Sequence, residues 1–411
     1  MRGFFALVLL PFFGNAQSIK TFVKTNSFPV LSIDPQNENY TDLEAFGKSV
    51  GDATVVMLGE QSHGDATTFE AKTRLIKYLH EQKGFNVLAF EGDFFALNHG
   101  WDSVPKTKAA TDTFLRNNIY GLWTHCHTAQ HLFYEYIPAT FGTNSPLVVT
   151  GFDNQLTMPW SRAYAVRYID SLAHDLCIPF IDHPSYAHAI DCIKGMVDMQ
   201  IHQDSALYTK ARAYLQQFKQ ELADTLSHAE FPMMVIDNLI AFAKQMQYDD
   251  NRAQEHVSHN VRDEQMARNL KWLYEYRYTG QKIIVWAANL HISKFFKPPV
   301  QTMGGYLALD SAFIKKVYVL GFTSQKGVSG LVKLRREKIE KPKKQSLENW
   351  IPINFSYAFI DFKPYNACSS NSKEPFAMRY IGHLMYAKDH WNTFFDGMFF
   401  IREMHPCEKA E

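Results

Sequence analysis

Five short apolar runs set the strongest limit on the fold of this chain. They are rich in β-branched and aromatic residues, lack polar alternation, and cover residues 54–59, 85–90, 146–151, 282–287 and 316–321. This pattern is typical of parallel strands that are buried on both faces. Between the first two runs, Phe69, Leu75, Ile76 and Leu79 recur at helical spacing before Gly84, which indicates a βαβ unit. The sequence therefore predicts an α/β fold with a central, mostly parallel sheet flanked by helices.

The stretch from about residue 160 to residue 276 contains no comparable strand. It has the pattern of consecutive helices, for example at residues 204–226, 233–246 and 261–276. We therefore expect a large helical insertion in the α/β core, within one domain that spans residues 17–411. Methionine and aromatic residues at helical spacing in this insertion are more typical of an ordinary core than of a binding groove.

The N-terminus has the features of a secretory signal peptide. Arg2 is followed by an almost purely apolar run at residues 3–13, and small residues precede Gln17. We expect residues 1–16 to be removed by cleavage near Ala16. The apolar run of 11 residues is well below the ~20 that span a bilayer, and no cysteine stands at the junction. A periplasmic or secreted product without a stable membrane anchor after cleavage is therefore predicted.

Charge and cysteine content exclude several classes of protein. The chain has 42 Lys plus Arg and 42 Asp plus Glu, so no field of one sign indicates a nucleic-acid partner. The basic segment 333–344 is expected to be a solvated hairpin or loop. Five scattered cysteines in 411 residues do not form a disulfide scaffold. Cys177 and Cys192 flank a proline-containing loop and are the pair most expected to be bridged.

Polar side chains follow four of the predicted strands. In chain order they are Glu60, His63, Glu91, Asp153, Asn289 and His291. Because ligands bind beyond the carboxyl ends of parallel strands, we expect these side chains to share one rim. Single carboxylates at such positions often only cap helices or stabilise turns. We expect Asp65 to be a helix cap, and Asp93 and Asp153 are equally consistent with a structural role.

The combination of residues points to proton transfer from water. Glu60 and His63 lie three apart in a turn bracketed by Gly59 and Gly64, whose glycines allow a sharp backbone path. An imidazole beside a carboxylate is held in one tautomer and acts as a general base. In this interpretation Glu91 orients the water or His63. His291 then polarises a carbonyl or protonates a leaving alcohol.

Other chemistries are less favoured by the sequence. No G-x-S-x-G element is present, so Ser62 is a weaker candidate as a nucleophile. The same histidines and carboxylates are acceptable ligands for zinc, manganese or iron. A second cluster, His125, Cys126 and His127 with His131, is interpreted as structural rather than metal-binding because it lacks an HExxH or CxxC element. No phosphate-binding glycine loop or GxGxxG fingerprint occurs, which argues against a nucleotide or dinucleotide cofactor. We predict no cofactor, and we assign no residue as a metal ligand.

An ordered set of short motifs extends from about residue 40 to about residue 402. It comprises VVMLGEQSHG at 55–64, AFEGD at 89–93, GFD at 151–153, RD at 262–263 with MA at 266–267, WAANLH at 286–291, MG at 303–304 and FDG at 395–397. In content and order this set resembles the erythromycin esterase family.

The resemblance implies a hydrolase domain in which His63 activates a water molecule to open a macrolide lactone without a covalent intermediate. Glu60 and Glu91 stand at the positions of the family's active-site glutamates, and His291 stands at the second histidine of its WAHNxH element. The implied catalytic residues are thus His63, Glu60, Glu91 and His291. The predicted substrate contacts are Lys72, His127, Asp153 and Asn289.

The chain departs from the family pattern at three positions. Ala288 replaces the first histidine of WAHNxH, Lys72 replaces an arginine nine residues past the catalytic histidine, and His127 replaces a glutamate that commonly follows the WxxxE tryptophan. A lysine keeps the charge of arginine but loses its bidentate fork, and an alanine removes a proton carrier.

Three functional hypotheses follow. The first is an exported, metal-independent hydrolase of a small-molecule ester or lactone, with a macrolide of the antibiotic-inactivation type, a polysaccharide ester and a secondary metabolite as alternative substrates. The second is a metal-dependent hydrolase or a metal- or haem-binding protein, because the GExxH turn is similar to that of haem-uptake and Tiki-type proteins. The third is a binding protein that has lost turnover through Ala288.

Overall fold

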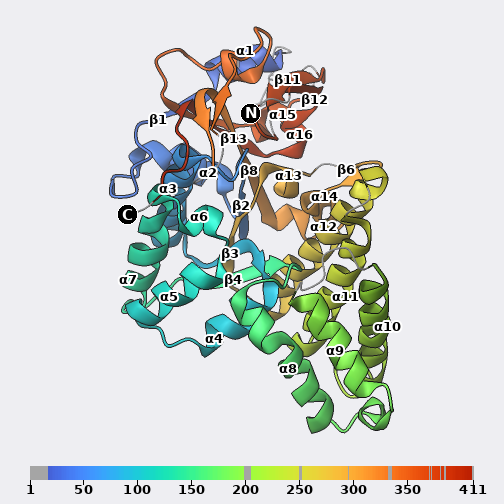
Figure 1. Ribbon diagram of the computed structural model, residues 1–411. Coiled ribbons are helices and arrows are strands. Elements are labelled where there is room, and N and C mark those ends of the chain that lie inside the picture. The colour runs from blue at the N-terminus through green and yellow to red at the C-terminus, as the bar shows by residue number, and fades with distance from the viewer. Residues whose placement is uncertain are drawn as a thin grey trace, which may run out of the picture.

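A nine-stranded sheet forms the centre of the molecule (Figure 1). The structure, a computed structural model, describes residues 17–198, 205–249, 252–294, 296–331, 336–369, 371, 373–379, 381–383 and 386–409. The expected signal peptide, residues 1–16, lies outside the described residues. Eight strands follow the order β1-β10-β13-β8-β2-β5-β3-β4, and β9 pairs with β8. The bounds are β1 Ser27–Val30, β2 Val55–Leu58, β3 Phe85–Asp93, β4 Val148–Asp153, β5 Lys282–Trp286, β8 Val317–Ser329, β9 Glu337–Ile339, β10 Tyr357–Asp361 and β13 Gly397–Met404.

The sheet is mostly parallel, which confirms the predicted fold class. The neighbours from β13 through β8, β2, β5 and β3 to β4 all pair in parallel, whereas β1, β10 and β9 pair antiparallel. All five apolar runs found in the sequence correspond to parallel strands, namely β2, β3, β4, β5 and β8. The described end of the basic segment 333–344 forms β9 and completes a hairpin with β8, as expected.

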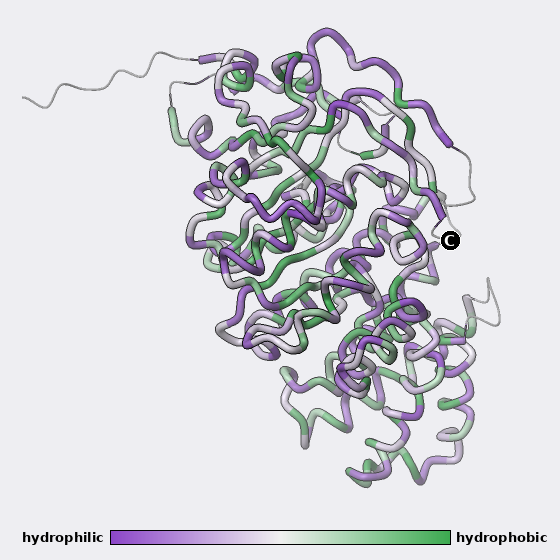
Figure 2. Tube along the Cα trace, turned by 90° about the vertical axis from the view of Figure 1, so that its left-hand side faces the viewer, coloured by the Kyte–Doolittle hydropathy of each residue, from purple (hydrophilic) through white to green (hydrophobic). Residues whose placement is uncertain are grey.

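Both faces of the sheet are covered by helices. Alternate side chains of β2 enter different cores: Val55 and Met57 pack on the side of the insertion helices, and Val56 and Leu58 pack on the side of α3 (Ala66–Lys83). All four side chains are fully buried, which explains why the strand lacks polar alternation. Figure 2 shows hydrophobic residues along the inner strands, whereas hydrophilic residues predominate in the outer loops.

The helical insertion connects an edge strand to the middle of the sheet. After β4 the chain forms α8 (Pro159–Asp175), α9 (Tyr186–Val197), α10 (Ser205–Leu222), α11 (Phe231–Asp249) and α12 (Glu255–Trp272), and it returns as β5 between β2 and β3. In Figure 1, α8 to α11 extend below the sheet. Helix α12 packs against β4, so the last helix of the insertion lies next to the strand ends.

Shorter helices complete the layers. Their bounds are α1 Ile19–Thr25, α2 Glu44–Val50, α4 Trp101–Ser103, α5 Lys108–Asn118, α6 Gly121–Thr124, α7 Ile137–Thr140, α13 Asn289–Ile292, α14 Met303–Ala308, α15 Lys363–Ala367 and α16 Trp391–Phe394. Two small antiparallel pairs, β6 Phe296–Lys297 with β7 Val300–Gln301 and β11 Phe376–Arg379 with β12 Tyr386–Asp389, lie outside the main sheet. Among the described residues, the structure has no helix that is both long enough and apolar enough to span a membrane.

One disulfide joins distant parts of the chain, and it is not the predicted one. Cys126 is bonded to Cys407, 281 residues away, whereas Cys177 and Cys192 are free thiols. Cys177 is exposed after the end of α8, and Cys192 is buried on the packed face of α9. The predicted pairing was wrong because proximity in sequence does not fix the directions of the two side chains, which a disulfide requires.

Candidate active site

The sheet brings the predicted catalytic residues to one edge. Glu60 and His63 follow β2, Glu91 lies near the end of β3, Asp153 ends β4, and His291 lies in α13 directly after β5. Because these four strands run in parallel, their carboxyl ends meet at the same edge of the sheet.

The closest contact within this set joins Glu60 and His63. The Nδ1 atom of His63 lies 2.6 Å from Oε1 of Glu60. The glutamate is buried, whereas the imidazole side chain of His63 retains 37% exposure. Since a carboxylate only accepts hydrogen bonds, Nδ1 carries the proton in this pair, which leaves the Nε2 lone pair of His63 available. Burial alone would lower the pKa of His63, but the hydrogen bond to Glu60 and the charges of Glu60 and Glu91 raise it above its ordinary value.

Two further donors hold Glu60 in its charged form. Lys72 donates from Nζ to Oε2 at 2.8 Å, and Trp123 of α6 donates from Nε1 to Oε1 at 2.9 Å. Burial would raise the pKa of Glu60, but Lys72 and His63 outweigh it and lower the pKa below its ordinary value. The indole of Trp123 also packs edge-on against the ring of His63.

Lys72 is buried rather than open to a ligand. Its side chain has no exposed surface, and its ammonium group lies 3.9 Å from the centre of the Trp286 ring. Burial lowers the pKa of Lys72 to about 8, although the charge of Glu60 opposes this effect. In this conformation Lys72 positions Glu60, and its predicted contact with a substrate stays a prediction.

The two glycines around the Glu60–His63 turn are required by close packing rather than by an unusual backbone angle. Neither Gly59 nor Gly64 has a positive φ. A Cβ atom at Gly64 would lie 2.5 Å from the carbonyl carbon of Gly330, and one at Gly59 would lie 2.1 Å from Oδ1 of Asn289. The close packing of the turn against neighbouring chain segments therefore accounts for both glycines, and the expected sharp backbone path stays a prediction.

Asn289 connects α13 to β8. Its side-chain amide donates to the carbonyl of Phe322 at 2.7 Å and accepts from the N–H of Phe322 at 3.0 Å. Its backbone N–H donates to the carbonyl of Glu60 at 2.8 Å. The side chain is fully buried, so the structure places it as a link between site segments, and its predicted contact with a substrate stays a prediction.

An arginine from the insertion joins Glu91 to Asp153. Arg262 of α12 donates to Oδ2 of Asp153 at 2.6 Å and to Oε1 of Glu91 at 2.9 Å. The other oxygen of Glu91 accepts from the backbone N–H of Ala288 at 2.9 Å. Burial would raise the pKa of Glu91, but His291 and Arg262 hold it well below its usual range. Asp153 thus fixes the arginine, and the predicted contact of Asp153 with a substrate stays a prediction.

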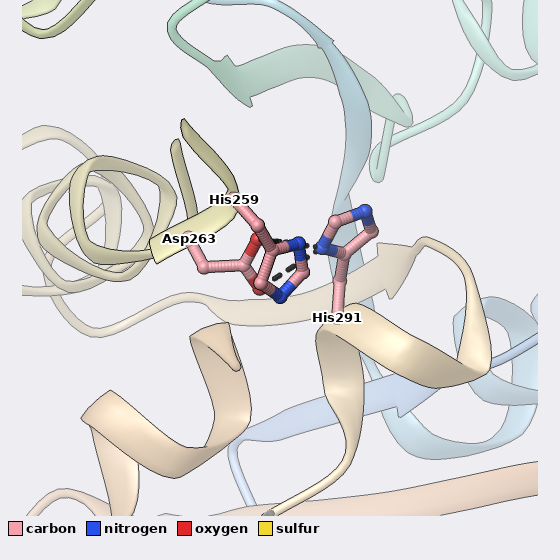
Figure 3. A group of neighbouring side chains, drawn as sticks. All are labelled: His259, Asp263 and His291. Carbon is pink, nitrogen blue, oxygen red and sulfur yellow. Dashed lines mark hydrogen bonds and ion pairs between the residues drawn. The ribbon is translucent and has the colours of Figure 1, made fainter. Parts of the chain in front are cut away.

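His291 lies between the carboxylates of Asp263, which Figure 3 draws, and Glu91. Its Nδ1 is 2.9 Å from both carboxylate oxygens of Asp263, and its Nε2 is 3.3 Å from Oε1 of Glu91. Burial would lower the pKa of His291, but Asp263 and Glu91 raise it to about 10. His259, which lies one turn before Asp263 in α12, stacks on the His291 ring with centres 5.6 Å apart. Burial lowers the pKa of His259.

Two expectations about neighbouring residues, His127 and Asp65, have different outcomes. His127 is exposed, and its backbone N–H donates to Glu408, so its contact with a substrate also stays a prediction. Asp65 stands at the start of α3 but does not cap it. Its carboxylate instead accepts from Ser329 at 2.7 Å and lies 2.8 Å from Nε2 of His383. The predicted cap was wrong because the buried carboxylate has side-chain partners from distant segments.

The two metal hypotheses from the sequence can be compared with the geometry. At the GExxH turn, the ammonium group of Lys72 donates to the second carboxylate oxygen of Glu60. Its positive charge would repel a metal cation bound at the same carboxylate. Among the described residues, His259, Asp263 and His291 lie close enough together to hold a metal ion, whereas the histidine cluster at 125–131 does not. This last group was not predicted, because two of its members come from α12 rather than from a strand end.

Comparison with known proteins gives a consistent result. The family model of erythromycin esterase matches residues 80–404. A Bacillus subtilis protein named "Putative hydrolase YbfO" is 27% identical over 326 residues, which cover 72% of this chain and 70% of that protein. Erythromycin esterase type II of Escherichia coli is 30% identical over 101 residues, 24% of each chain.

Solved structures share the fold. A mutant of the erythromycin esterase EreC in its open conformation superposes with a TM-score of 0.65 and 17% identity, covering 92% of this chain and 98% of that one. A structure described as a succinoglycan biosynthesis protein superposes with a TM-score of 0.70 and 19% identity, covering 94% and 97% of the two chains.

Proposed function

The chain belongs to the erythromycin esterase family, and from this premise we propose that it is a hydrolase that cleaves an ester or a lactone with a water molecule activated by His63. The observation that carries the proposal is the 2.6 Å contact between Nδ1 of His63 and Glu60. The imidazole side chain of His63 is 37% exposed in spite of this contact. A base needs a fixed tautomer and an accessible lone pair, and this arrangement supplies both.

The proposed reaction moves one proton from water to the leaving group. Nε2 of His63 removes a proton from water while the water oxygen bonds to the carbonyl carbon and the carbonyl π electrons move to its oxygen. When the tetrahedral intermediate collapses, the bond from carbon to the alcohol oxygen breaks. His63 then returns its proton to that oxygen, so that an acid and an alcohol are released and the histidine is again neutral.

His291 and Arg262 are the groups proposed to stabilise the charge on the carbonyl oxygen. Both remain partly accessible, with 7% and 18% side-chain exposure. Asp263 and Asp153 hold them in place, so that little reorganisation accompanies the reaction. Glu91 contacts both groups, and its negative charge also raises the pKa of His63.

The proposed substrate is a small-molecule ester or lactone. A macrolide antibiotic is one candidate, supported by the name of the family and by EreC as a structural neighbour. An ester on a polysaccharide or on a secondary metabolite is an alternative, because the arginine and the first histidine of the family pattern are replaced by Lys72 and Ala288. We propose no cofactor for the hydrolytic step.

We further propose that the chain is exported, with residues 1–16 removed near Ala16, and acts in the periplasm or outside the cell without a membrane anchor. The Cys126–Cys407 disulfide supports this localisation, because disulfides persist in oxidising compartments. Mass spectrometry of the protein from cell fractions is expected to find a mature chain that begins at Gln17. Retention of residues 1–16 on a cytoplasmic product would contradict the proposal.

The test of the hydrolase is mass spectrometry of erythromycin and a panel of lactones and acyl esters after incubation with the protein. We expect one substrate to gain the mass of one water with the wild type and with a His131→Ala control, whose histidine pairs with exposed Glu135, but not with His63→Ala. Turnover that is abolished by a chelator would instead support a metal-dependent hydrolase. Thermal stabilisation by a panel member without product would support a binding protein.

A further inference from the structure

The group His259, Asp263 and His291 has a feature that the proposed hydrolytic mechanism does not explain. Nε2 of His259 is buried and has no hydrogen-bond partner among the described residues. Its Nδ1 lies 3.5 Å from Oδ2 of Asp263, at the limit of a hydrogen bond. Buried polar side chains are normally satisfied, so an imidazole of this kind requires an explanation.

The three side chains converge from two elements. His259 and Asp263 are separated by four residues on α12 and therefore lie on the same face of that helix. His291 enters from α13, and Figure 3 shows both imidazoles directed to the carboxylate of Asp263. One ligand atom from each residue can be chosen so that all three lie within 4.8 Å of one another.

These separations are close to those of a zinc site. Ligand atoms at about 2.0–2.2 Å from a tetrahedral Zn²⁺ lie roughly 3.4 Å apart. Here Nδ1 of His291 is 2.9 Å, and Nδ1 of His259 is 3.5 Å, from Oδ2 of Asp263. Both distances to Oδ2 are thus within about 0.5 Å of the tetrahedral value, and the two histidine nitrogens lie within 4.8 Å of each other. A side-chain adjustment that closes around one ion would leave a fourth position for water.

The surroundings resemble the outer shell of a histidine-bound metal. Nε2 of His291 lies 3.3 Å from Oε1 of Glu91 and 3.2 Å from Nη1 of Arg262. When Nε2 carries the proton, its contact with Glu91 is that of a carboxylate–histidine–metal triad. The backbone N–H of Met303 donates to Oδ1 of Asp263 at 2.7 Å and orients the carboxylate, which leaves Oδ2 toward the two histidines.

The local balance of charge favours a bound cation. Arg262 pairs with Glu91 and Asp153, whereas Asp263 pairs with His291. Once Nδ1 of His291 gives up its proton to bind a metal ion, these three buried carboxylates face the single guanidinium of Arg262. Lys72 is committed to Glu60 and does not contribute to this balance. A divalent ion at Asp263 would offset the excess of negative charge.

We propose that His259, Asp263 and His291 bind a divalent transition-metal ion of the zinc type. Two imidazole nitrogens and one carboxylate oxygen suit Zn²⁺ or Co²⁺ and do not suit Mg²⁺ or Ca²⁺, which take oxygen ligands. The ion would bind Nδ1 of His291 in place of its proton and leave Nε2 directed to Glu91. The site therefore shares His291 with the proposed charge-stabilising groups, but it is distinct from the GExxH turn and from the proposed base His63.

The test is Co²⁺ and Zn²⁺ binding to the full chain, measured by visible absorption for Co²⁺ and by calorimetry for Zn²⁺. We expect one Co²⁺ per chain with the intense absorption of tetrahedral cobalt, and no binding of Mg²⁺. Loss of outer-shell partners of a metal typically weakens affinity by 10–100-fold. Replacing a direct ligand in His259→Phe, which keeps the stacked ring, is therefore expected to weaken Zn²⁺ binding by about 100-fold or more.

A matched control lies on the same helix. His256 is one turn before His259 in α12 and is not part of the group, so His256→Ala is expected to bind both ions as the wild type does. Asp263→Asn, whose amide oxygen can still accept from Met303, provides a second variant should His259→Phe fail to fold.

Two results would overturn the proposal: no stoichiometric binding to the wild type, or wild-type affinity in a folded variant at position 259 or 263. Because the measurement uses no turnover, its outcome is independent of whether the chain hydrolyses an ester. Conversely, failure to find a substrate in the hydrolase test leaves the metal measurement unaffected.

Discussion

The hydrogen bond between Glu60 and His63 can be weakened by replacing Glu60 with glutamine. The carboxylate accepts from three donors, His63, Trp123 and Lys72. An amide of the same shape can accept through one oxygen only, and its NH₂ group then faces one of these donors. Glu60→Gln therefore removes the charge that stabilises the His63 imidazolium while nearly preserving the packing.

The size of the effect follows from the contacts. A hydrogen bond to a charged group contributes roughly 1.5–3 kcal/mol. Because the imidazole of His63 is 37% exposed, solvent screening places the loss near the lower value. At 1.36 kcal/mol per factor of ten, kcat/KM is expected to fall by about tenfold.

The pH dependence gives a more specific signature. The pKa of His63 is raised by Glu60 and Glu91, and the base must be neutral to act. In the wild type, kcat/KM should therefore rise with pH through a midpoint above the ordinary value of about 6.5. In Glu60→Gln this midpoint should move to lower pH. The contribution of His63 to the free energy of unfolding should be complete below about pH 6.5 and lost as the pH rises through the raised pKa.

Two assays check this prediction. The first is the pH profile of kcat/KM on the ester or lactone identified by mass spectrometry. The second is an NMR titration of the histidine ring signals, with His63 assigned from the spectrum of His63→Ala, which requires no substrate. Glu135→Gln is the matched control, because Glu135 pairs with His131 at 2.7 Å on the surface. An unchanged pKa of His63 in Glu60→Gln would refute the reasoning.

Three further predictions concern stability and are checked by urea unfolding. Lys72→Met leaves its buried glutamate partner without an ammonium group and is expected to lower the free energy of unfolding by about 3–5 kcal/mol; an unchanged midpoint would mean that the pair is not formed. Cys407→Ser opens the disulfide to Cys126 and is expected to cost about 2–4 kcal/mol, whereas Cys177→Ser, at an exposed free thiol, should cost little. Gly64→Ala places a Cβ 2.5 Å from backbone of Gly330 and is expected to cost about 1–3 kcal/mol through overpacking; wild-type stability would show that the turn can move.

The strands and their polar ends were predictable because their signals are local. A fully buried parallel strand must be apolar along its whole length, and a polar residue directly after it must lie at the carboxyl edge of the sheet. From these two facts, the sequence alone predicts that Glu60, His63, Glu91 and His291 lie close together. The expected helices of the insertion are likewise present because helical periodicity is carried by neighbouring residues.

The remaining features depend on contacts between distant residues. Nothing near Cys126 in sequence identifies Cys407 as its partner, because the pairing follows from the path of the chain after β13. Lys72 lies on a helix that looks amphipathic in sequence, and only the tertiary structure shows its ammonium group beneath Glu60. The same holds for Asp65, whose position suggests a cap but whose partners come from the C-terminal third of the chain.

The helical insertion completes the site rather than merely decorating the sheet. Its last helix, α12, supplies Arg262 to Glu91 and Asp153, and it supplies Asp263 to His291. Without α12, Asp153 would lose the guanidinium that pairs with it, and Glu91 would keep only His291 and the backbone N–H of Ala288. A buried carboxylate without a paired charge is strongly unfavourable. The arginine therefore links stability to function. The insertion must pack on β4 for these carboxylates to be neutralised, and the same contact orients the groups that we propose face the substrate.

Helices α9 and α10 do not contribute to the site in this way, because they pack mainly against the other insertion helices rather than against the strand ends.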